Sequence, residues 1–276
     1  MPEDRAAKLL THPEALCNMV RRIALEAGEI AMRYYDGLED MQVDIKYDDS
    51  PVTLADRETE AFIQAALEQL TPAVPFVGEE AAALGRVKAV ACTEYFWLVD
   101  PIDGTKDFIN GSDEFTVNIA LVKQGVPVLG VIYAPAKGEL FAAHGPRTAI
   151  RWLEDTDNEK RISVRPVPKN GLTVVSSKHY ENSAGRDEFL ERFKIEKIVK
   201  KSSSLKICAI AMGRADIYPR FGPTCEWDTA AGDAILRAAG GAITDINGAP
   251  LQYGGANPKW LNPEFVAASF EWFGSE

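Results

Sequence analysis

Two carboxylates and a hydroxyl lie close together in the segment Asp100-Pro101-Ile102-Asp103-Gly104-Thr105, directly after the apolar run Phe96-Trp97-Leu98-Val99. A buried strand that ends in a turn would hold these groups rigidly. Carboxylates three residues apart, with the Ile102 carbonyl between them, offer the oxygen ligands that hard cations such as Mg²⁺ prefer. For this segment alone, an ordinary Asp-Gly turn is the alternative. Acidic residues elsewhere in the chain favour a metal site.

Three further acidic residues lie at the ends of predicted elements: Glu79 closes a short strand, Asp56 begins one helix and Asp228 begins another. Taken singly, each has a simpler explanation, as a helix cap or as a solvated side chain. Several carboxylates that converge repel one another unless cations neutralise them. Together with Asp100 and Asp103 they suit a two-metal site, with ions about 3.5–4 Å apart, that hydrolyses a phosphate ester.

Other catalytic chemistries have little support in the sequence. The three histidines, His12, His144 and His179, lie in no motif for a Ser/His/Asp triad or a zinc site. The chain contains neither GxGxxG nor GxxxxGK[ST], so nucleotide binding of the Rossmann or P-loop type is not indicated.

Composition narrows the class of protein. The 276 residues are 46% hydrophobic and carry a net charge of −11, which argues against a nucleic-acid binder. An anionic substrate remains compatible, because a bound cation can invert the charge of an acidic pocket. The four cysteines lack CxxC spacing and are expected to be reduced thiols.

We predict a cytoplasmic protein, because the sequence shows neither a signal peptide nor an apolar segment near the roughly 18 residues of a membrane span. A peripheral association with the inner membrane through Arg21 and Arg22 stays open, although a solvated helix face explains that pair more simply. The sequence also leaves open whether the protein is a monomer or a homodimer.

Hydrophobic periodicity predicts a layered α/β and α+β protein in two lobes. The N-terminal α+β lobe, residues 1–148, would carry most metal ligands, and the C-terminal α/β lobe, residues 149–276, would carry Asp228. We expect helices near 13–35, 54–70, 184–193, 204–212 and 228–239, and strands near 74–77, 95–100, 115–123, 127–134, 138–143, 172–176, 197–200, 215–219 and 241–246. The segment 44–52 should be extended, and the charged stretch 145–170 should be the irregular boundary between the lobes.

Four motifs, in this order, resemble those of the inositol monophosphatase superfamily of Mg²⁺-dependent, lithium-sensitive phosphatases. They are Ser50-Pro51-Val52-Thr53-Leu54-Ala55-Asp56, Gly78-Glu79-Glu80, the run from Leu98 to Thr105, and Trp227-Asp228-Thr229-Ala230-Ala231-Gly232. The resemblance implies the layered αβαβα sugar-phosphatase fold. Segments 104–109, 114–121, 203–206 and 218–224 are similar to the bacterial 3′(2′),5′-bisphosphate nucleotidases of sulfate assimilation. Lys106 supports that branch, since inositol monophosphatases tend to have threonine there.

The resemblance implies two or three Mg²⁺ ions. Glu79, Asp100 and the Ile102 carbonyl would bind the first metal, and Asp100, Asp103 and Asp228 the second.

The resemblance also implies catalytic roles. Asp56 and Thr105 would form a hydrogen-bonded pair that, with Glu79, orients and activates the attacking water. The amides of Gly104 and Thr105 would contact the scissile phosphate, and the helix that begins near Asp228 would help to bind it.

Substrate recognition is assigned to Ser204, Lys206, His179 and Arg220, which would contact the second phosphate and the nucleoside. For each of them, a solvated surface residue is the alternative.

The resemblance therefore implies a phosphatase that removes the 3′-phosphate of adenosine 3′,5′-bisphosphate by metal-activated water attack, giving AMP and phosphate. The partner would be a small phosphorylated nucleotide, with 3′-phosphoadenylyl sulfate as a second substrate. An inositol (poly)phosphate phosphatase of the same fold and a non-catalytic nucleotide-binding protein are the alternatives.

Overall fold

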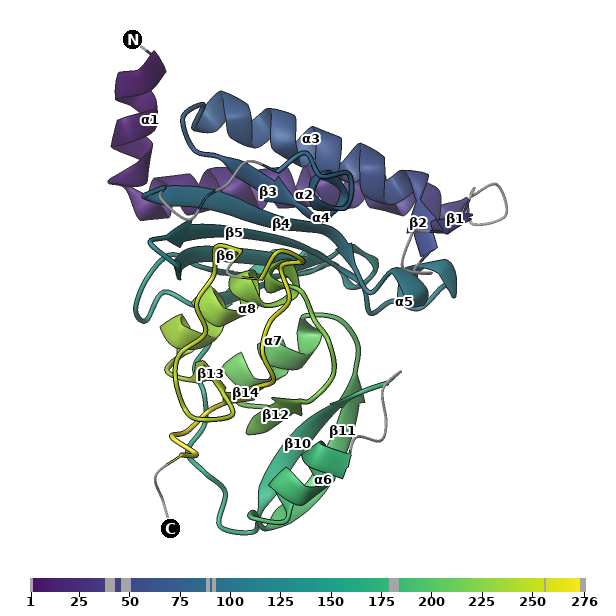
Figure 1. Ribbon diagram of the computed structural model, residues 1–276, viewed down its shortest axis with the longest axis vertical. Coiled ribbons are helices and arrows are strands. Elements are labelled where there is room, and N and C mark those ends of the chain that lie inside the picture. Colours follow the sequence, from purple (N-terminus) through teal and green to yellow (C-terminus); the bar gives the residue numbers. More distant parts are fainter. Residues whose placement is uncertain are drawn as a thin grey trace.

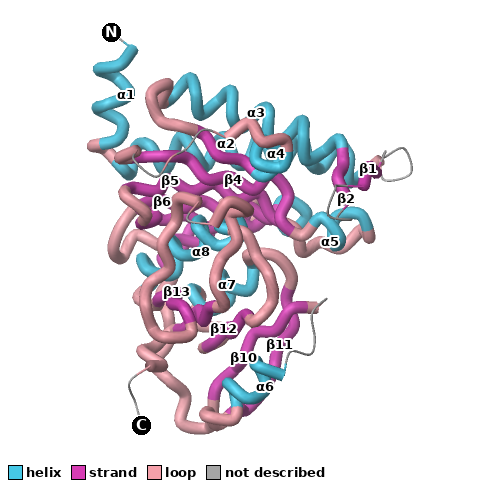
Figure 2. The backbone as a smooth tube through the Cα atoms, in the orientation of Figure 1, coloured by secondary structure: helices cyan, strands magenta, loops and turns pink. Residues whose placement is uncertain are grey.

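The computed structural model describes residues 2–37, 43–45, 51–87, 90, 93–178, 184–255 and 257–273. Its elements form five layers, helix–sheet–helix–sheet–helix (Figures 1 and 2). Helices α2 and α3 cover one face of a seven-stranded sheet, α7 and α8 cover its other face, and a five-stranded sheet with α6 lies beyond them. The layered αβαβα prediction is therefore confirmed.

The described helices differ widely in length. They are α1 (Pro2–Leu10), α2 (Pro13–Asp36), α3 (Leu54–Leu70), α4 (Glu79–Ala83), α5 (Thr105–Ile109), α6 (Ala184–Leu190), α7 (Leu205–Ala211) and α8 (Glu226–Ala239), with a 3₁₀ turn η2 at Pro135–Lys137. The helices expected at 13–35 and 54–70 are confirmed as α2 and α3. Helices α1, α4 and α5 were not predicted, since very short helices leave little periodicity to read.

The larger sheet has the order β3-β4-β5-β6-β7-β8-β9. Its strands are β3 (Phe76–Gly78), β4 (Tyr95–Asp103), β5 (Thr116–Lys123), β6 (Val126–Ala134), β7 (Glu139–Ala143), β8 (Ile150–Leu153) and β9 (Asn158–Arg161). Only β3 and β4 are parallel in this sheet, and the described strands from β4 to β9 form an antiparallel meander. A separate two-stranded sheet pairs β1 (Val43–Ile45) with β2 (Pro51–Thr53) within the extended segment that was expected, and residues 46–50 lie outside the described residues.

The smaller sheet has the order β11-β10-β12-β14-β13. It comprises β10 (Leu172–Ser177), β11 (Ile195–Lys201), β12 (Ile217–Arg220), β13 (Ala242–Asp245) and β14 (Phe265–Ala268). Strand β14, which was not predicted, lies antiparallel between β12 and β13.

Both faces of the larger sheet are buried along its central strands, β4 to β6. Trp97 and Val99 of β4 pack with α2 and α3, whereas Phe96 and Leu98 pack in the cluster that contains α7 and α8. A strand buried on both faces reads as a continuous apolar run, which is why 96–99 shows no alternation in the sequence. Helix α8 approaches β6 closely because Gly130 has no side chain; a Cβ there would overlap the carbonyl oxygen of Ala231.

The stretch 145–170 is irregular only in part: β8 and β9 extend the larger sheet to Arg161, and residues 162–170 follow without helix or strand. All four residues of β9 are exposed, so no buried face marks it in the sequence. The division of the chain at 148/149 stays a prediction, and a boundary after Arg161 would keep this sheet whole.

Helix α2 contacts the sheet edge through Arg21, which pairs with Glu159 of β9 at 2.6 Å. Of the predicted solvated pair, only Arg22 is exposed. Within the described ranges, no helix combines the length and apolar character needed to cross a bilayer. Cys17, Cys208 and Cys225 are free thiols, and Cys92 lies outside the described residues.

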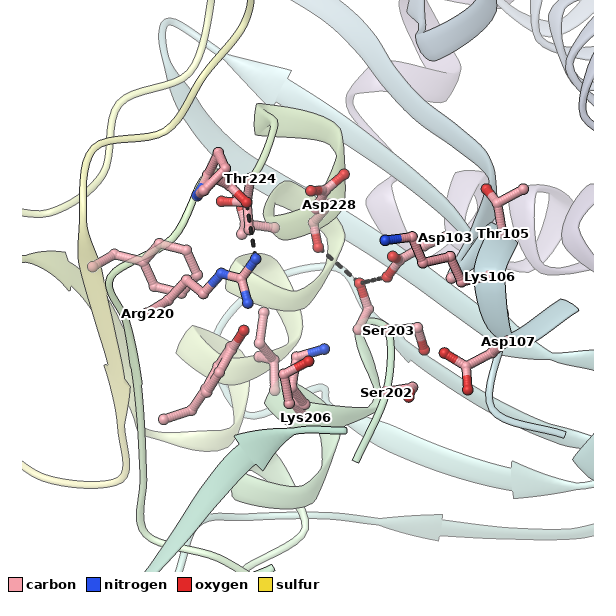
Figure 3. A pocket seen from close by; sticks show the side chains of 18 of the residues that line it. Asp103, Thr105, Lys106, Asp107, Ser202, Ser203, Lys206, Arg220, Thr224 and Asp228 are labelled. Atoms are coloured by element: carbon pink, nitrogen blue, oxygen red, sulfur yellow. Dashed lines mark hydrogen bonds between the residues drawn. The ribbon is translucent and has the colours of Figure 1, made fainter. Parts of the chain in front are cut away.

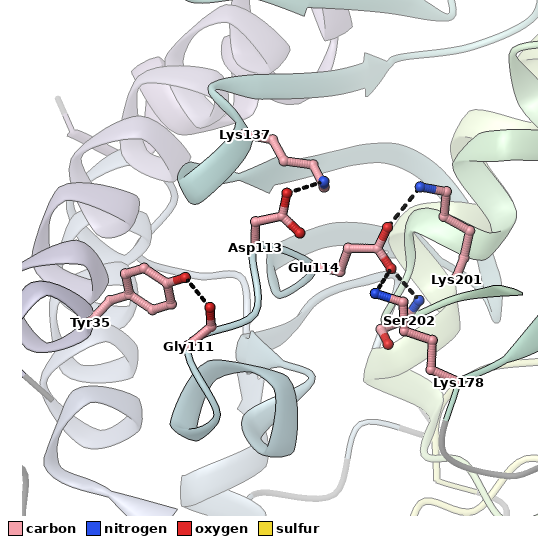
Figure 4. A network of polar contacts seen from close by, with 8 residues as sticks. All are labelled: Tyr35, Gly111, Asp113, Glu114, Lys137, Lys178, Lys201 and Ser202. Carbon is pink, nitrogen blue, oxygen red and sulfur yellow. Dashed lines mark hydrogen bonds and ion pairs between the residues drawn. The ribbon is translucent and has the colours of Figure 1, made fainter.

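One carboxylate joins the two sheets (Figure 4). Glu114, just before β5, accepts hydrogen bonds from Lys201 Nζ at 2.7 Å and from the Ser202 amide at 3.0 Å, and pairs with Lys178 Nζ at 2.9 Å. Lys178 and Lys201 lie at the carboxyl ends of the parallel strands β10 and β11. Glu114 therefore fixes these strand ends against the larger sheet.

Candidate active site

The carboxylates of the Asp-Pro-Ile-Asp segment are presented by a bulge rather than a turn. Asp100 is paired with Asn118 and Asp103 with Thr116, so β4 has one residue more than β5 over this stretch. Such a bulge redirects side chains next to an active site. The strand ends at Asp103. Gly104 follows with a left-handed φ of 93°, which favours glycine, and α5 begins at Thr105.

The other acidic residues come from three different helices. Asp56 is 1% exposed in the first turn of α3. Glu79 begins α4 directly after β3, and is not merely the end of a strand as predicted. Asp228 lies in the first turn of α8, which begins two residues earlier than expected, and its Oδ2 accepts a hydrogen bond from the Cys225 amide at 2.9 Å.

Electrostatics shows that these carboxylates converge. Burial raises the pKa of Asp100 well above its ordinary value, and the charges of Glu79, Asp103, Asp228 and Asp56 raise it further. A carboxyl that senses four acidic neighbours lies at the centre of their cluster. The five acidic residues named from the sequence are therefore neighbours in the fold.

Asp228 has a similar environment. Burial and the charge of Asp103 raise the pKa of Asp228 to about 8, although the Cys225 amide opposes the shift. Like charges held this close favour protonation or a bound cation. Hard carboxylate oxygens in a buried cluster are the donor set that suits Mg²⁺.

Several of these carboxylates are hydrogen-bonded to protein donors. Asp100 Oδ1 accepts from the Ile102 amide at 3.1 Å, and Asp103 Oδ2 accepts from the Ser204 hydroxyl at 2.9 Å. Throughout the part of the chain that the structure describes, no three His, Cys, Asp or Glu residues are gathered as a ready metal cluster.

Ser204 connects the two halves of the site. Its hydroxyl lies 2.9 Å from Asn118 Nδ2, 2.9 Å from Asp103 Oδ2 and 2.7 Å from the Asp228 carbonyl oxygen. The hydroxyl accepts a hydrogen bond from Asn118, and its single proton is shared between two acceptors, the Asp103 carboxylate and the Asp228 carbonyl. Ser204 thus contacts two acidic residues of the site, and the substrate contact expected for it stays a prediction.

A cavity of about 240 Å³ opens beside the carboxylates (Figure 3). One wall is acidic, with Glu79 and Asp103 from the N-terminal half and Asp228 from α8, and the other carries cations and hydroxyls from the C-terminal half. The predicted residues that line it are Glu79, Asp103, Gly104, Thr105, Ser204, Lys206, Arg220 and Asp228.

The cationic wall is shaped by two predicted residues. Lys206 Nζ lies 5.5 Å from the centroid of the Tyr218 ring. Burial, and to a smaller extent Arg220, lowers the pKa of Lys206 to about 8, although the Asp103 carboxylate opposes this. Arg220 is 9% exposed and donates to the carbonyls of Gly222 at 3.2 Å and Pro223 at 2.9 Å, which fixes its guanidinium at the cavity.

Several cavity residues were missed from the sequence, and two of them are serines. Ser202 and Ser203 line the cavity, and among the described residues their buried hydroxyls have no hydrogen-bond partner. Buried hydroxyls normally have partners, so unpaired ones at a cavity wall suit a bound polar ligand. The serine run 202–204 was a signal, but only the fold distinguishes the paired Ser204 from its neighbours.

The remaining predicted residues lie elsewhere. Asp56, Asp100 and Ile102 are buried and do not line the cavity. The Thr105 hydroxyl donates to the Ile102 carbonyl at 3.3 Å, and its predicted pairing with Asp56 stays a prediction. His179 lies outside the described residues.

A family profile and individual known sequences both match this chain over most of its length. Residues 12–272 match the profile described as the inositol monophosphatase family. The 3′(2′),5′-bisphosphate nucleotidase CysQ of Salmonella typhimurium is 42% identical over 251 residues, which cover 91% of this chain and 98% of that protein. The enzyme of the same name from Escherichia coli K12 is 41% identical over 250 residues, with the same coverage.

Solved structures agree with the sequence matches. CysQ from Bacteroides thetaiotaomicron, described as a bacterial member of the inositol monophosphatase family, aligns with a TM-score of 0.76 at 36% identity. That alignment covers 93% of this chain and 98% of the other. An inositol monophosphatase from Anabaena sp. PCC 7120 aligns with a TM-score of 0.73 at 25% identity, over 94% and 92% of the two chains.

Proposed function

The chain belongs to the inositol monophosphatase family, and from that premise we propose that it is a cytoplasmic Mg²⁺-dependent 3′(2′),5′-bisphosphate nucleotidase. It would remove the 3′-phosphate of adenosine 3′,5′-bisphosphate, giving AMP and phosphate. The observation that carries the proposal is the two-sided cavity, with converging carboxylates on one wall and Lys206, Arg220 and unpaired serine hydroxyls on the other. The relatives named as nucleotidases support the same substrate class.

The acidic wall has the ligands that divalent cations prefer. The buried, mutually repelling carboxylates of Glu79, Asp100, Asp103 and Asp228, with the Ile102 carbonyl, would hold two or three Mg²⁺ ions. When bound, such ions supply positive charge for the phosphate oxygens and lower the pKa of water.

The protein's own groups would orient the reacting water. Thr105 and Glu79 both line the cavity, so Thr105 Oγ1 and the Glu79 carboxylate can accept hydrogen bonds from a water there. Asp56, buried in the first turn of α3, would accept the Thr105 proton in turn. The chain would thereby lead the proton of the attacking water away from the phosphate.

The opposite wall would recognise the rest of the nucleotide. Lys206 and Arg220 supply positive charge for a second phosphate, and Ser202 and Ser203 offer hydroxyl donors. This wall favours a bisphosphate over an inositol monophosphate, which has no second anionic group to bind. The wall also suits 3′-phosphoadenylyl sulfate, whose sulfated 5′ end is likewise anionic.

We also propose that the cavity lies between two lobes, residues 1–148 and 149–276. Glu79 and Asp103 come from the first lobe, and Lys206, Arg220 and Asp228 from the second. The small phosphorylated nucleotide would bind across them.

The test is phosphate release with Mg²⁺ from adenosine 3′,5′-bisphosphate, inositol 1-phosphate, AMP and fructose 1,6-bisphosphate. We expect a large preference for the first compound and 3′-phosphoadenylyl sulfate to be turned over as well. A preference for inositol 1-phosphate would overturn the substrate while keeping the metal site. Release from none of them, with nucleotide binding retained, would indicate a non-catalytic binding protein.

A further inference from the structure

Glu60 is a buried carboxylate that neither the family motifs nor the cavity lining include. It lies in α3, one helical turn after Asp56, and is 5% exposed. Its Oε2 accepts a hydrogen bond from the Glu80 amide and its Oε1 one from the Ala81 amide, both at 2.7 Å. Both carboxylate oxygens are thus used on two consecutive amides of α4.

The backbone beside these amides is shaped to admit the Glu60 carboxylate. A Cβ at Gly78 would lie 2.5 Å from Glu60 Oε2 and closer still to Cδ. The φ of Gly78 is −115°, which any residue can adopt, so glycine is required here by the close approach and not by the backbone conformation. Glu60 therefore contacts the chain on both sides of Glu79.

Glu79 is the one residue between these contacts whose side chain lines the cavity. Gly78 precedes it and the Glu80 and Ala81 amides follow it, so the Glu60 carboxylate restrains the backbone that carries Glu79 (hydrogen bonds at 2.7 Å). Burial raises the pKa of Glu60 to about 7, although the two amide hydrogen bonds oppose the shift. In its ionised form the carboxylate makes an aligned pair of charge-assisted hydrogen bonds, which are stronger and more directional than neutral ones.

We propose that Glu60 is a positioning residue for the metal site: through the amides of α4 it sets the direction in which Glu79 presents its carboxylate. The inference rests on the proposed metal-dependent function. Groups behind the ligands of a metal site commonly control affinity, because they fix ligand orientation. Glu60 would do this through the main chain instead of a side-chain hydrogen bond.

A purely structural role for Glu60 would predict a different result. If Glu60 only fastened α3 to α4, its loss would lower stability and leave metal affinity unchanged in the folded protein. If it orients Glu79, metal affinity falls even where the protein is folded. Glu60→Gln separates the two, because a glutamine of the same shape has only one acceptor oxygen for the two amides.

The experiment is Mg²⁺ titration by isothermal calorimetry without substrate, at a temperature at which circular dichroism shows each variant folded. For Glu60→Gln we expect Mg²⁺ affinity to fall about 10- to 100-fold, the usual effect of losing support behind a ligand. In activity assays the Mg²⁺ concentration for half-maximal rate should rise, with the KM for nucleotide unchanged at saturating Mg²⁺.

Glu58→Gln is the matched control. Glu58 lies in the same helix, is partly exposed and bonds to Arg33 and Tyr34, away from α4. This variant should bind Mg²⁺ within about twofold of the wild type, since only an exposed pair is lost. Gly78→Ala is the second variant, whose new methyl should displace the Glu60 carboxylate. It should weaken Mg²⁺ binding as Glu60→Gln does, and the double variant should show little additional loss.

Wild-type Mg²⁺ affinity in folded Glu60→Gln would overturn the inference and leave the proposed function intact. The same holds if Gly78→Ala binds Mg²⁺ normally. A wild-type protein that binds no Mg²⁺ would overturn the metal site itself, and the positioning role with it.

Discussion

Glu114 offers a direct test of how the two sheets are held together. Replacing it by glutamine keeps the shape of the side chain and removes the charge that Lys178 and Lys201 share. Burial alone would raise the pKa of Glu114, but hydrogen bonds from Lys201, Lys178 and the Ser202 amide outweigh it and lower the pKa from 4.5 to about 2.

The lowered pKa of Glu114 sets the loss of stability that we expect from this substitution. A pKa lowered from 4.5 to about 2 corresponds to about 3.5 kcal/mol, at about 1.4 kcal/mol for each tenfold change in the equilibrium. The side chains of Lys178 and Lys201 are 38% and 39% exposed, so solvent screening reduces this value. We therefore expect Glu114→Gln to lower the free energy of unfolding by about 2 kcal/mol at pH 7.

The sign of the pH dependence follows from the same shift. A carboxyl group whose pKa is lower in the folded protein stabilises it above the unfolded pKa, near 4.5. This contribution is lost as the pH falls toward 2. The difference between wild type and variant should thus be constant from pH 7 to 5 and shrink below pH 4.5.

Urea unfolding followed by tryptophan fluorescence measures this difference, since the chain has five tryptophans. Asp113→Asn is the control: Asp113 is the neighbouring residue, pairs with Lys137 at 2.5 Å and is 57% exposed, so its loss should cost less than about 1 kcal/mol. A Glu114→Gln variant as stable as wild type at pH 7 would refute the reasoning, as would a difference unchanged at pH 3.

Three further predictions concern the site and the core. Asp103→Asn should lower turnover by about 100-fold or more with an unchanged circular dichroism spectrum, because the site loses a charged group; near-normal phosphate release would contradict the two-metal site. Chelation by EDTA should abolish phosphate release, added Mg²⁺ should restore it, and Li⁺ should inhibit; activity that survives chelation would show that the metal is not needed. Gly130→Ala should lower the free energy of unfolding by about 1–3 kcal/mol, because the new methyl would overlap the Ala231 carbonyl; a melting temperature equal to wild type would show that α8 can move away from β6.

The local sequence determined the helices with strong hydrophobic periodicity and the kinds of chemical group that the site contains. The apolar spacing of α2 and α3 gave their bounds within one residue, because a helix that buries one face shows that face in its sequence. The oxygen-rich groups around Asp100 and Asp103 indicated a cation site for a similarly local reason, since ligand type and spacing suffice to suggest the metal.

Tertiary structure decided which distant groups meet and what each of them does. Asp228 is more than a hundred residues from Asp103, yet its charge acts on the same cluster because α8 packs between the two sheets. Ser202 and Ser204 are chemically alike, but only the fold leaves one hydroxyl unpaired at the cavity and surrounds the other with partners.

The elements that the sequence did not reveal have the same physical explanation. Strand β9 is exposed along its length and is held by its pairing with β8, and Glu60 owes its position to two amides twenty residues away. Hydrogen bonds between two strands, or between a side chain and a backbone amide, leave no hydrophobic periodicity in the segments that make them. The sequence by itself therefore determined the chemistry available to this protein, and the packing of its two sheets decided how that chemistry is arranged.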